Sequence, residues 1–241
     1  MCRKTRATDV AASTPTRIVI EVIVQTLEDA RAAWQGGADR LEVVRDIMSG
    51  GLTPEASLVD AIAAETGLPL RVMVRENAGY ATDAAELPRL CRAVERFSQA
   101  GVDGIVLGFA AQGRVAMREL RAALESVPEA SVTFHRAFDQ LDDPLAAIDE
   151  IAQLRQVDRI LTNGGGGDAP SRAARLRQYV DRAGDRLRIL AGGGVDAGAF
   201  ELFARTRCVD EIHVGRLARD ADAGDAPVSA ARVRRLREVA G

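Results

Sequence analysis

Short apolar runs alternate with longer stretches of helical periodicity along most of the chain. The runs are five to seven residues long and rich in Val, Ile and Leu. This pattern is typical of strands buried on both faces of a parallel sheet. We therefore predict eight strands, at Ile18–Val24, Arg40–Val44, Leu70–Arg75, Gly104–Phe109, Ser131–His135, Asp158–Thr162, Arg186–Ala191 and Asp210–Val214.

A helix-period stretch follows each predicted strand. Thr26 and the pair Asp143–Pro144 are residues typical of helix N-termini. Glycine turns at Gly37–Asp39 and Gly101–Asp103 lead from a helix into the next strand, where a left-handed glycine cap is common. The predicted helices are Leu27–Trp34, Pro54–Glu65, Ala84–Gln99, Met117–Ser126, Pro144–Leu154, Ser171–Arg182, Ala197–Ala204 and Val228–Val239.

Eight strand–helix units in one chain predict an α/β fold, a single (β/α)₈ TIM-type barrel with its working face at the C-terminal ends of the strands. We assign the barrel to residues 18–241 and a flexible N-terminal extension to residues 1–17, which are mostly polar or small. A doubly wound open sheet is the alternative. It is disfavoured because the first strand and its continuation, IVIEVIVQT, lack the glycines of a dinucleotide-binding turn.

Side chains along a strand of the barrel point alternately to the lumen and to the helices. In the first strand, Ile18, Ile20, Val22 and Val24 supply an apolar outer face, which turns Glu21 inward. The same alternation applies to four other strands. The ionisable side chains predicted to enter the lumen are Glu21, Glu42, Arg71, Arg75, His135, Glu211 and His213.

These inward charges have two interpretations. They can form a fixed ion-pair layer that fills the barrel, with Arg75 between Glu21 and Glu42, because an unpaired buried charge is costly. They can instead form a catalytic site of Glu21, Glu42, Arg75 and His135, with His135 at its strand end as a general acid or base near neutral pH. His213 fits either interpretation.

Glycine clusters follow the last three predicted strands. Gly164–Gly167 follows the sixth strand, Gly192, Gly193 and Gly194 follow the seventh, and Gly215 and Arg216 follow the eighth. Glycine lets main-chain amides approach an anion, and loops after the last two strands are the usual phosphate site of such barrels. We predict an anion site at Gly192, Gly193, Gly194, Gly215 and Arg216, which tight turns alone can also explain.

Composition narrows the classes of function. The net charge is −3, so the chain lacks the surplus of basic residues that is typical of a nucleic-acid-binding protein. The absence of a long apolar run predicts no membrane span, and the polar N-terminus lacks a signal-peptide core, so we expect a cytoplasmic protein. Lys4 is the only lysine, which excludes a Schiff base in the barrel. Cys2, Cys91 and Cys208 are too widely spaced to indicate a disulfide framework or a zinc site.

Several motifs, in a fixed order, resemble the CutC family of copper homeostasis proteins. The run VTFHRAFD at Val132–Asp139 is the most specific of them. The resemblance extends from Ile18 to Val214 and implies a cytoplasmic TIM-like barrel, a role in copper handling and a homo-oligomer. The other motifs are Gly37–Glu42 (GADRLE), Gly50–Pro54 (GGLTP), Arg159–Gly164 (RILTNG), Ile189–Val195 (ILAGGGV) and Glu211–His213 (EIH).

The chain departs from this family in its cysteines. Family members often carry cysteines at the end of the first strand and after the Glu of the second, where this chain has Ile23, Val24 and Val44. Copper(I) favours thiolate and thioether ligands. We therefore predict copper(I) binding no better than that of a generic protein surface, and we assign no cofactor beyond the copper that the resemblance implies.

Three functions stay open at this point. The first is the copper-handling role of the family. The second is an enzyme, an isomerase, lyase or hydrolase, that acts on a small anionic metabolite, phosphorylated or not, through Glu21, Glu42 and His135. The third is a binding or assembly module without catalysis. A hard divalent metal on Glu21, Glu42 and His135 also stays open, because their spacing is not diagnostic.

Overall fold

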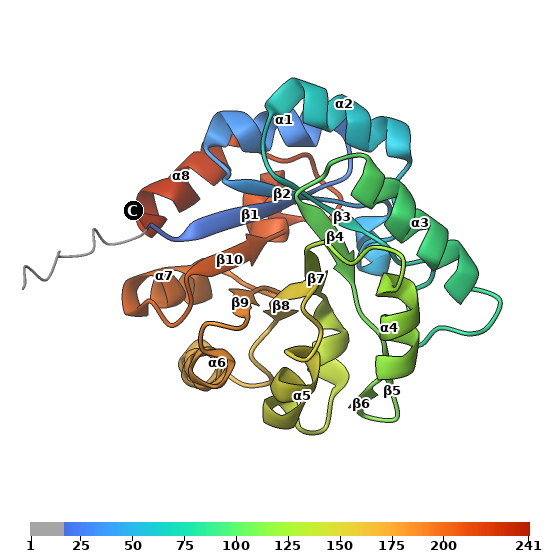
Figure 1. Ribbon diagram of the computed structural model, residues 1–241. Helices are drawn as coiled ribbons and strands as arrows, with labels where there is room; N and C mark the ends of the chain where they lie inside the picture. Colours follow the sequence, from blue (N-terminus) through green and yellow to red (C-terminus); the bar gives the residue numbers. More distant parts are fainter. Residues whose placement is uncertain (1–16) are drawn as a thin grey trace, which may run out of the picture.

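The computed structural model describes residues 17–241, so almost all of the predicted N-terminal extension, 1–17, lies outside the described residues. Eight parallel strands close into a barrel in the order β1-β10-β9-β8-β7-β4-β3-β2, which confirms the predicted (β/α)₈ fold. Figure 1 shows the strands at the centre and the helices around them. The strands are β1 (Val19–Val24), β2 (Arg40–Val43), β3 (Leu70–Met73), β4 (Gly104–Leu107), β7 (Val132–Phe134), β8 (Val157–Thr162), β9 (Arg188–Ala191) and β10 (Glu211–Val214).

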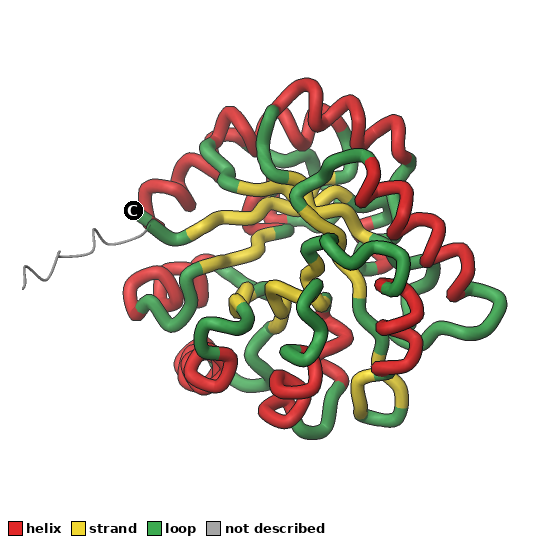
Figure 2. The backbone as a smooth tube through the Cα atoms, viewed as in Figure 1, coloured by secondary structure: helices red, strands yellow, loops and turns green. Residues whose placement is uncertain are grey.

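The helices form an outer layer, which Figure 2 shows in red around the yellow strands. Local signals fix their ends. The Thr26 hydroxyl accepts a hydrogen bond from the Asp29 amide at 3.0 Å, and Gly37 ends the same helix in the left-handed region. The helices are α1 (Leu27–Gly36), α2 (Ala56–Thr66), α3 (Leu87–Gln99), α4 (Met117–Leu124), α5 (Pro144–Ile151), α6 (Ala169–Ala183), α7 (Ala197–Thr206) and α8 (Ala230–Ala240).

Two short strands, β5 (Ala110–Ala111) and β6 (Arg114–Val115), form a hairpin that the sequence pattern did not predict. Each has only two residues, which is too short for alternation to be visible. Gln112 and Gly113 connect them with positive φ angles of 51° and 72°. The hairpin extends the loop between β4 and α4 and does not join the barrel.

The main core lies between barrel and helices. Ile20, Val22, Leu41 and Val43 face the helices and are completely buried, as the alternation predicted. A second, smaller apolar cluster consists of Ile23, Val44, Met73 and Val106, with Ile47 packed against it. We call it the inner cluster.

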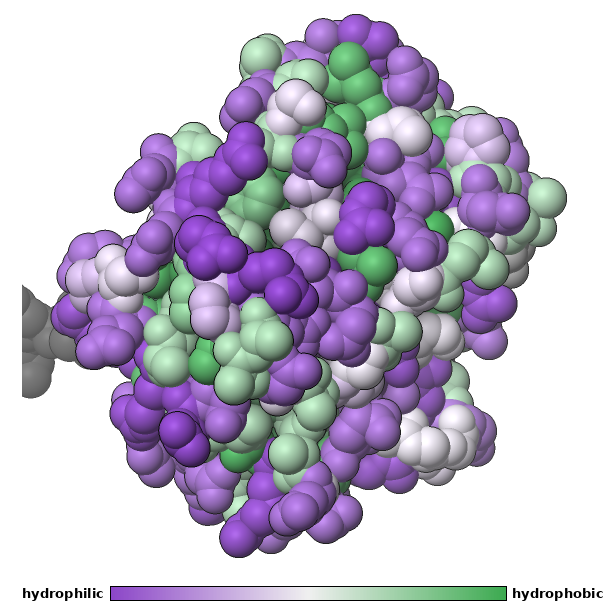
Figure 3. Space-filling model, turned by 90° about the vertical axis from the view of Figure 1, so that its right-hand side faces the viewer, coloured by the Kyte–Doolittle hydropathy of each residue, from purple (hydrophilic) through white to green (hydrophobic). Residues whose placement is uncertain are grey.

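Hydrophilic residues are spread across the face of the molecule in Figure 3, and hydrophobic areas lie between them. Among the described residues, no helix is long and apolar enough to cross a membrane.

Candidate functional site

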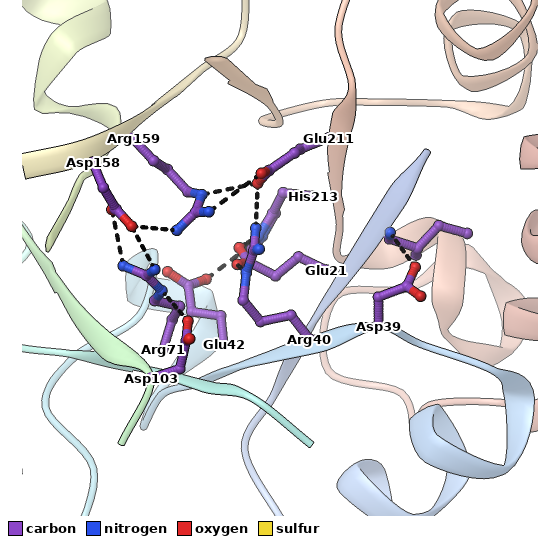
Figure 4. A network of polar contacts seen from close by, with 11 residues as sticks. Glu21, Asp39, Arg40, Glu42, Arg71, Asp103, Asp158, Arg159, Glu211 and His213 are labelled. Carbon is purple, nitrogen blue, oxygen red and sulfur yellow. Dashed lines mark hydrogen bonds and ion pairs between the residues drawn. The ribbon is translucent and has the colours of Figure 1, made fainter. Parts of the chain in front are cut away.

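The N-terminal half of the lumen is filled by a network of ion pairs (Figure 4). Arg40 on β2 contacts two carboxylates, with 2.5 Å from its Nε to Glu21 Oε2 and 2.5 Å from its Nη2 to Glu211 Oε2. Arg159 on β8 contacts Glu211 from the other side, at 2.8 Å. All four side chains are buried, and each charge has a partner of opposite sign, which offsets the cost of removing it from water.

The network continues across the barrel toward β3. Asp158 lies 3.2 Å from Arg159 and 2.8 Å from Arg71, and Arg71 also lies 2.7 Å from Asp103. Asp103 and Asp158 are more than one-third exposed, so the network reaches solvent at the N-terminal end of the strands. This part of the lumen is the fixed ion-pair layer of the first interpretation.

The predicted Glu21–Arg75–Glu42 network is wrong. Arg40 takes the place between carboxylates that the sequence argument gave to Arg75, and Arg40 and Arg159 were missed. The signal for Arg40 was available, because Arg40 lies two residues before Glu42 and must share its face of the strand.

His213 stands between two glutamates above this network. Its Nδ1 lies 2.8 Å from Glu21 Oε1, and its Nε2 lies 3.6 Å from Glu42 Oε2 (Figure 4). Burial alone would lower the pKa of His213, but Glu42 and Glu21 outweigh it and raise the pKa above its usual value. For Glu21, a carboxyl group, burial alone would raise the pKa, but Arg40 and His213 hold the pKa far below its usual range.

Glu42 differs from Glu21 in having no guanidinium against it. Burial raises its pKa to about 7, and the negative charge of Glu21 adds to the rise, while His213 opposes it. Its Oε1 is buried without a hydrogen-bond partner among the described residues. Glu42 is therefore a carboxyl group that changes protonation near neutral pH and has a free acceptor atom.

Arg75 follows β3 and binds main-chain oxygens of two loops. Its Nε lies 3.2 Å from the Gly79 carbonyl and its Nη1 lies 3.2 Å from the Gly50 carbonyl, while Nη2 donates to the Ala78 carbonyl. The guanidinium carbon lies 4.7 Å from the centre of the Tyr80 ring. Among the described residues, no carboxylate forms an ion pair with Arg75, although the charge of Glu42 acts on it at longer range.

His135 follows β7 and is buried in a neutral form. Its Nδ1 accepts a hydrogen bond from the Ala137 amide at 3.2 Å. Burial and the nearby charge of Arg75 lower its pKa to about 3. The ring therefore does not suit the general acid–base role near neutral pH that the sequence suggested. A neutral imidazole with Nδ1 as acceptor carries its hydrogen on Nε2 and can donate it to a ligand.

A cavity of about 190 Å³ opens at the C-terminal ends of the strands and brings these groups together. Glu42, Arg75, His135 and His213 line it, whereas Glu21 lies beneath His213 and does not reach it. Arg136 and the predicted anion residues Gly193, Gly194, Gly215 and Arg216 also line the cavity.

Gly192 does not fit the predicted anion site. Its amide donates to the Thr162 carbonyl at 2.8 Å and is unavailable to a ligand. A Cβ at this position would lie 2.6 Å from Cδ1 of Leu161, so glycine is needed for close packing.

The neighbouring glycines are oriented by Arg172. Its guanidinium donates to the carbonyls of Gly193 and Gly194, each at 3.0 Å. Because C=O and N–H of a trans peptide point in opposite directions, the next amides, of Gly194 and Val195, point away from Arg172. Gly193 and Gly194 line the cavity, and glycine at 193 leaves room for Arg136, whose Nε would lie 2.6 Å from a Cβ there.

Donor atoms of Glu21, Glu42 and His213 all lie within 4.8 Å of one another, which makes this cluster a candidate metal centre. Both oxygens of Glu21 are already engaged, by His213 and by Arg40. That leaves one imidazole nitrogen and one carboxylate, fewer than the three or four protein ligands of typical zinc sites. His135 is not part of the cluster. We assign no metal.

Comparison with known proteins agrees with the motif resemblance. The model of the CutC family matches residues 18–217. A family protein CutC of Caulobacter vibrioides is 35% identical over 199 residues, covering 82% of this chain and 80% of the relative. A family protein CutC of Pasteurella multocida is 30% identical over 197 residues, covering 81% of this chain and 80% of the relative.

Two solved structures support the fold. One, from Streptococcus agalactiae, carries a provisional assignment as the copper homeostasis protein CutC. Its TM-score is 0.74 at 23% identity, and the match covers 81% of this chain and 97% of the other. Orotidine 5'-phosphate decarboxylase from Pyrococcus horikoshii follows with a TM-score of 0.61 at 16% identity, covering 92% and 98% of the two chains. From the family match and these relatives, the chain belongs to the CutC family.

Proposed function

We propose that the barrel is an enzyme, an isomerase, lyase or hydrolase, that binds a small anionic metabolite in its mouth and transfers a proton through Glu42. The observation that carries the proposal is the carboxyl of Glu42 in the cavity wall, whose Oε1 has no hydrogen-bond partner among the described residues and whose pKa is about 7. A general acid or base works best when its pKa is near the operating pH.

The anionic part of the ligand is assigned to the rim of the cavity. Arg75 forms no ion pair with a carboxylate among the described residues, and burial, together with the charge of Arg136, lowers its pKa. Arg136 is itself paired with Asp139 at 2.9 Å, so a bound anion would mainly offset the charge of Arg75. Arg216 and the backbone at Gly193–Gly194 and Gly215 complete the rim, in the region where many TIM barrels bind phosphate.

Three further side chains, Glu21, His213 and His135, support proton transfer at Glu42. Glu21, held ionised by Arg40, accepts from Nδ1 of His213 and directs Nε2 toward Glu42. His213 then stabilises the carboxylate form of Glu42 when its proton leaves. His135 donates from neutral imidazole and can stabilise negative charge that develops on a ligand oxygen.

Copper homeostasis is the second candidate, because the provisional name of a structural relative carries it. The sulfur and nitrogen donors in the cavity lining are Met73, His135 and His213. Cys91 and Cys208 lie outside the lining. The lining therefore lacks the thiolates that copper(I) favours, and it fits an anionic metabolite better.

Isothermal titration with inorganic phosphate, comparing the wild-type protein with Arg75→Met, tests the anion site. We expect binding by the wild type and at least tenfold weaker binding by the variant. Incubation with a panel of small carboxylates and phosphates in D₂O, followed by NMR, then detects product or deuterium exchange. A panel without any turnover, together with equal phosphate affinities, would refute the proposal.

A further inference from the structure

The cavity at the barrel mouth has two chemically different parts. Its rim carries the guanidinium groups of Arg75, Arg136 and Arg216. Its other wall is apolar, with Ile23 and Met73 from the inner cluster, Ile47 packed against that cluster, and Leu161. Ile23 and Met73 are at most 7% exposed, so this wall lies deep in the lumen.

Uncharged side chains with a short hydroxyl or amide group are missing from this lining. Among the described residues that line the cavity there is no Ser, Thr, Asn, Gln or Asp. The polar side chains there are two histidines, three arginines, Glu42 and Tyr80. A ligand with several hydroxyl groups would lose water at Ile23, Met73 and Leu161 without gaining partners, and each unsatisfied hydroxyl costs binding free energy.

The volume limits the ligand further. A dry cavity of about 150 Å³ holds a benzene molecule. The cavity here is about 190 Å³, so it can accommodate one six-membered ring or a branched chain of similar size. The anionic group would then lie at the rim, where the cavity meets Arg216, an exposed residue.

We infer that the ligand is a compact anion with an apolar body of about six carbon atoms, aliphatic or aromatic, rather than a polyhydroxylated sugar phosphate. Its carboxylate or phosphate binds Arg75 and the rim, and its body packs on Ile23, Met73 and Leu161. This orientation carries the carbon atoms toward Glu42 at the cavity wall. The inference rests on the proposed function, because it uses the same anion site.

Matched probes test the inference on the intact protein by calorimetry: inorganic phosphate, phenyl phosphate, glycerol 3-phosphate and benzoate. We expect phenyl phosphate to bind at least tenfold more tightly than glycerol 3-phosphate or inorganic phosphate. Benzoate separates a carboxylate from a phosphate requirement. Met73→Gln should reduce the preference for phenyl phosphate severalfold. Met48→Gln, at an exposed methionine outside the cavity lining, should leave it unchanged.

The outcomes separate the two proposals. If glycerol 3-phosphate binds as tightly as phenyl phosphate or more tightly, the apolar-body inference is overturned while the anion site stands. If none of the four anions binds, the proposed function and the inference both fail. The comparison of probes on the wild type decides the matter even if Met73→Gln does not fold.

Discussion

Glu21 and His213 face each other directly across neighbouring strands, paired in the β1–β10 register, with 2.8 Å between Glu21 Oε1 and His213 Nδ1. This pair joins the two parts of the lumen. Below it, Glu21 belongs to the ion-pair network through Arg40, and above it His213 lines the cavity. The fixed charge layer therefore orients the imidazole that contacts Glu42.

Replacing Glu42 by Gln should abolish most of the turnover while leaving the rim intact. The amide has nearly the same shape but cannot take up or release a proton near pH 7. General acid–base groups contribute about 10²–10⁴-fold to rate, so kcat should fall by that amount with phosphate affinity unchanged. Glu55→Gln, at an exposed position before α2, is the matched control. Full activity in Glu42→Gln would remove Glu42 from the mechanism.

Glu42 also predicts a pH dependence of stability. Its pKa is about 7 in the folded protein against an ordinary value of 4.5. Between these values the folded state holds a proton that the unfolded state has released, so the free energy of unfolding falls as pH rises from about 4.5 to 7. Urea denaturation of wild type and Glu42→Gln at pH 5 and pH 8 measures this contribution. The variant should gain stability relative to wild type at pH 8, and parallel curves would contradict the assignment.

Arg40 should matter more for stability than the exposed arginines. Arg40→Ala leaves Glu21 and Glu211 without one of their buried cations, and breaking a buried pair typically costs about 3–5 kcal/mol. Arg31→Ala removes an exposed ion pair with Glu65 and should change the denaturation midpoint little. Chemical denaturation of both variants checks the contrast. Equal losses would mean that the lumen network contributes no more than a surface pair.

The sequence could predict which strand residues enter the lumen, because pleating forces the alternation. Glu21, Glu42 and His213 lie inside their strands, and their inward direction followed directly. The side chains with which they pair could not be predicted from the alternation. The pairing of Glu21 with His213 and with Arg40 depends on the register between strands, which is set by the stagger of the closed barrel.

Residues beyond the strand ends were harder to predict. β3 ends at Met73 and β7 at Phe134, so Arg75 and His135 lie past the pleated segments and their surroundings depend on loop conformation. The loop carbonyls around Arg75 and the Ala137 amide at His135 carried no signal in the sequence. The oligomer that the family resemblance implies stays a prediction, which light scattering can test.

Copper(I) binding is the remaining prediction, and the structure sharpens it. Copper(I) is bound by thiolate rather than thiol, and burial raises the pKa of both described cysteines, Cys91 and Cys208. Cys91 is on α3 and Cys208 precedes β10, so neither adds a ligand to the cavity.

A chromogenic chelator in competition should therefore strip copper(I) from the purified protein. The expected result is no stoichiometric site tighter than about micromolar, which corresponds to roughly −8 kcal/mol. A variant with Ser in place of Cys2, Cys91 and Cys208 is the control, because it removes adventitious thiol binding. Tight stoichiometric binding that persists in this variant would contradict the prediction. It would then assign copper to the sulfur and nitrogen donors of the cavity, Met73, His135 and His213, and Met73→Leu in the same background would have to weaken it.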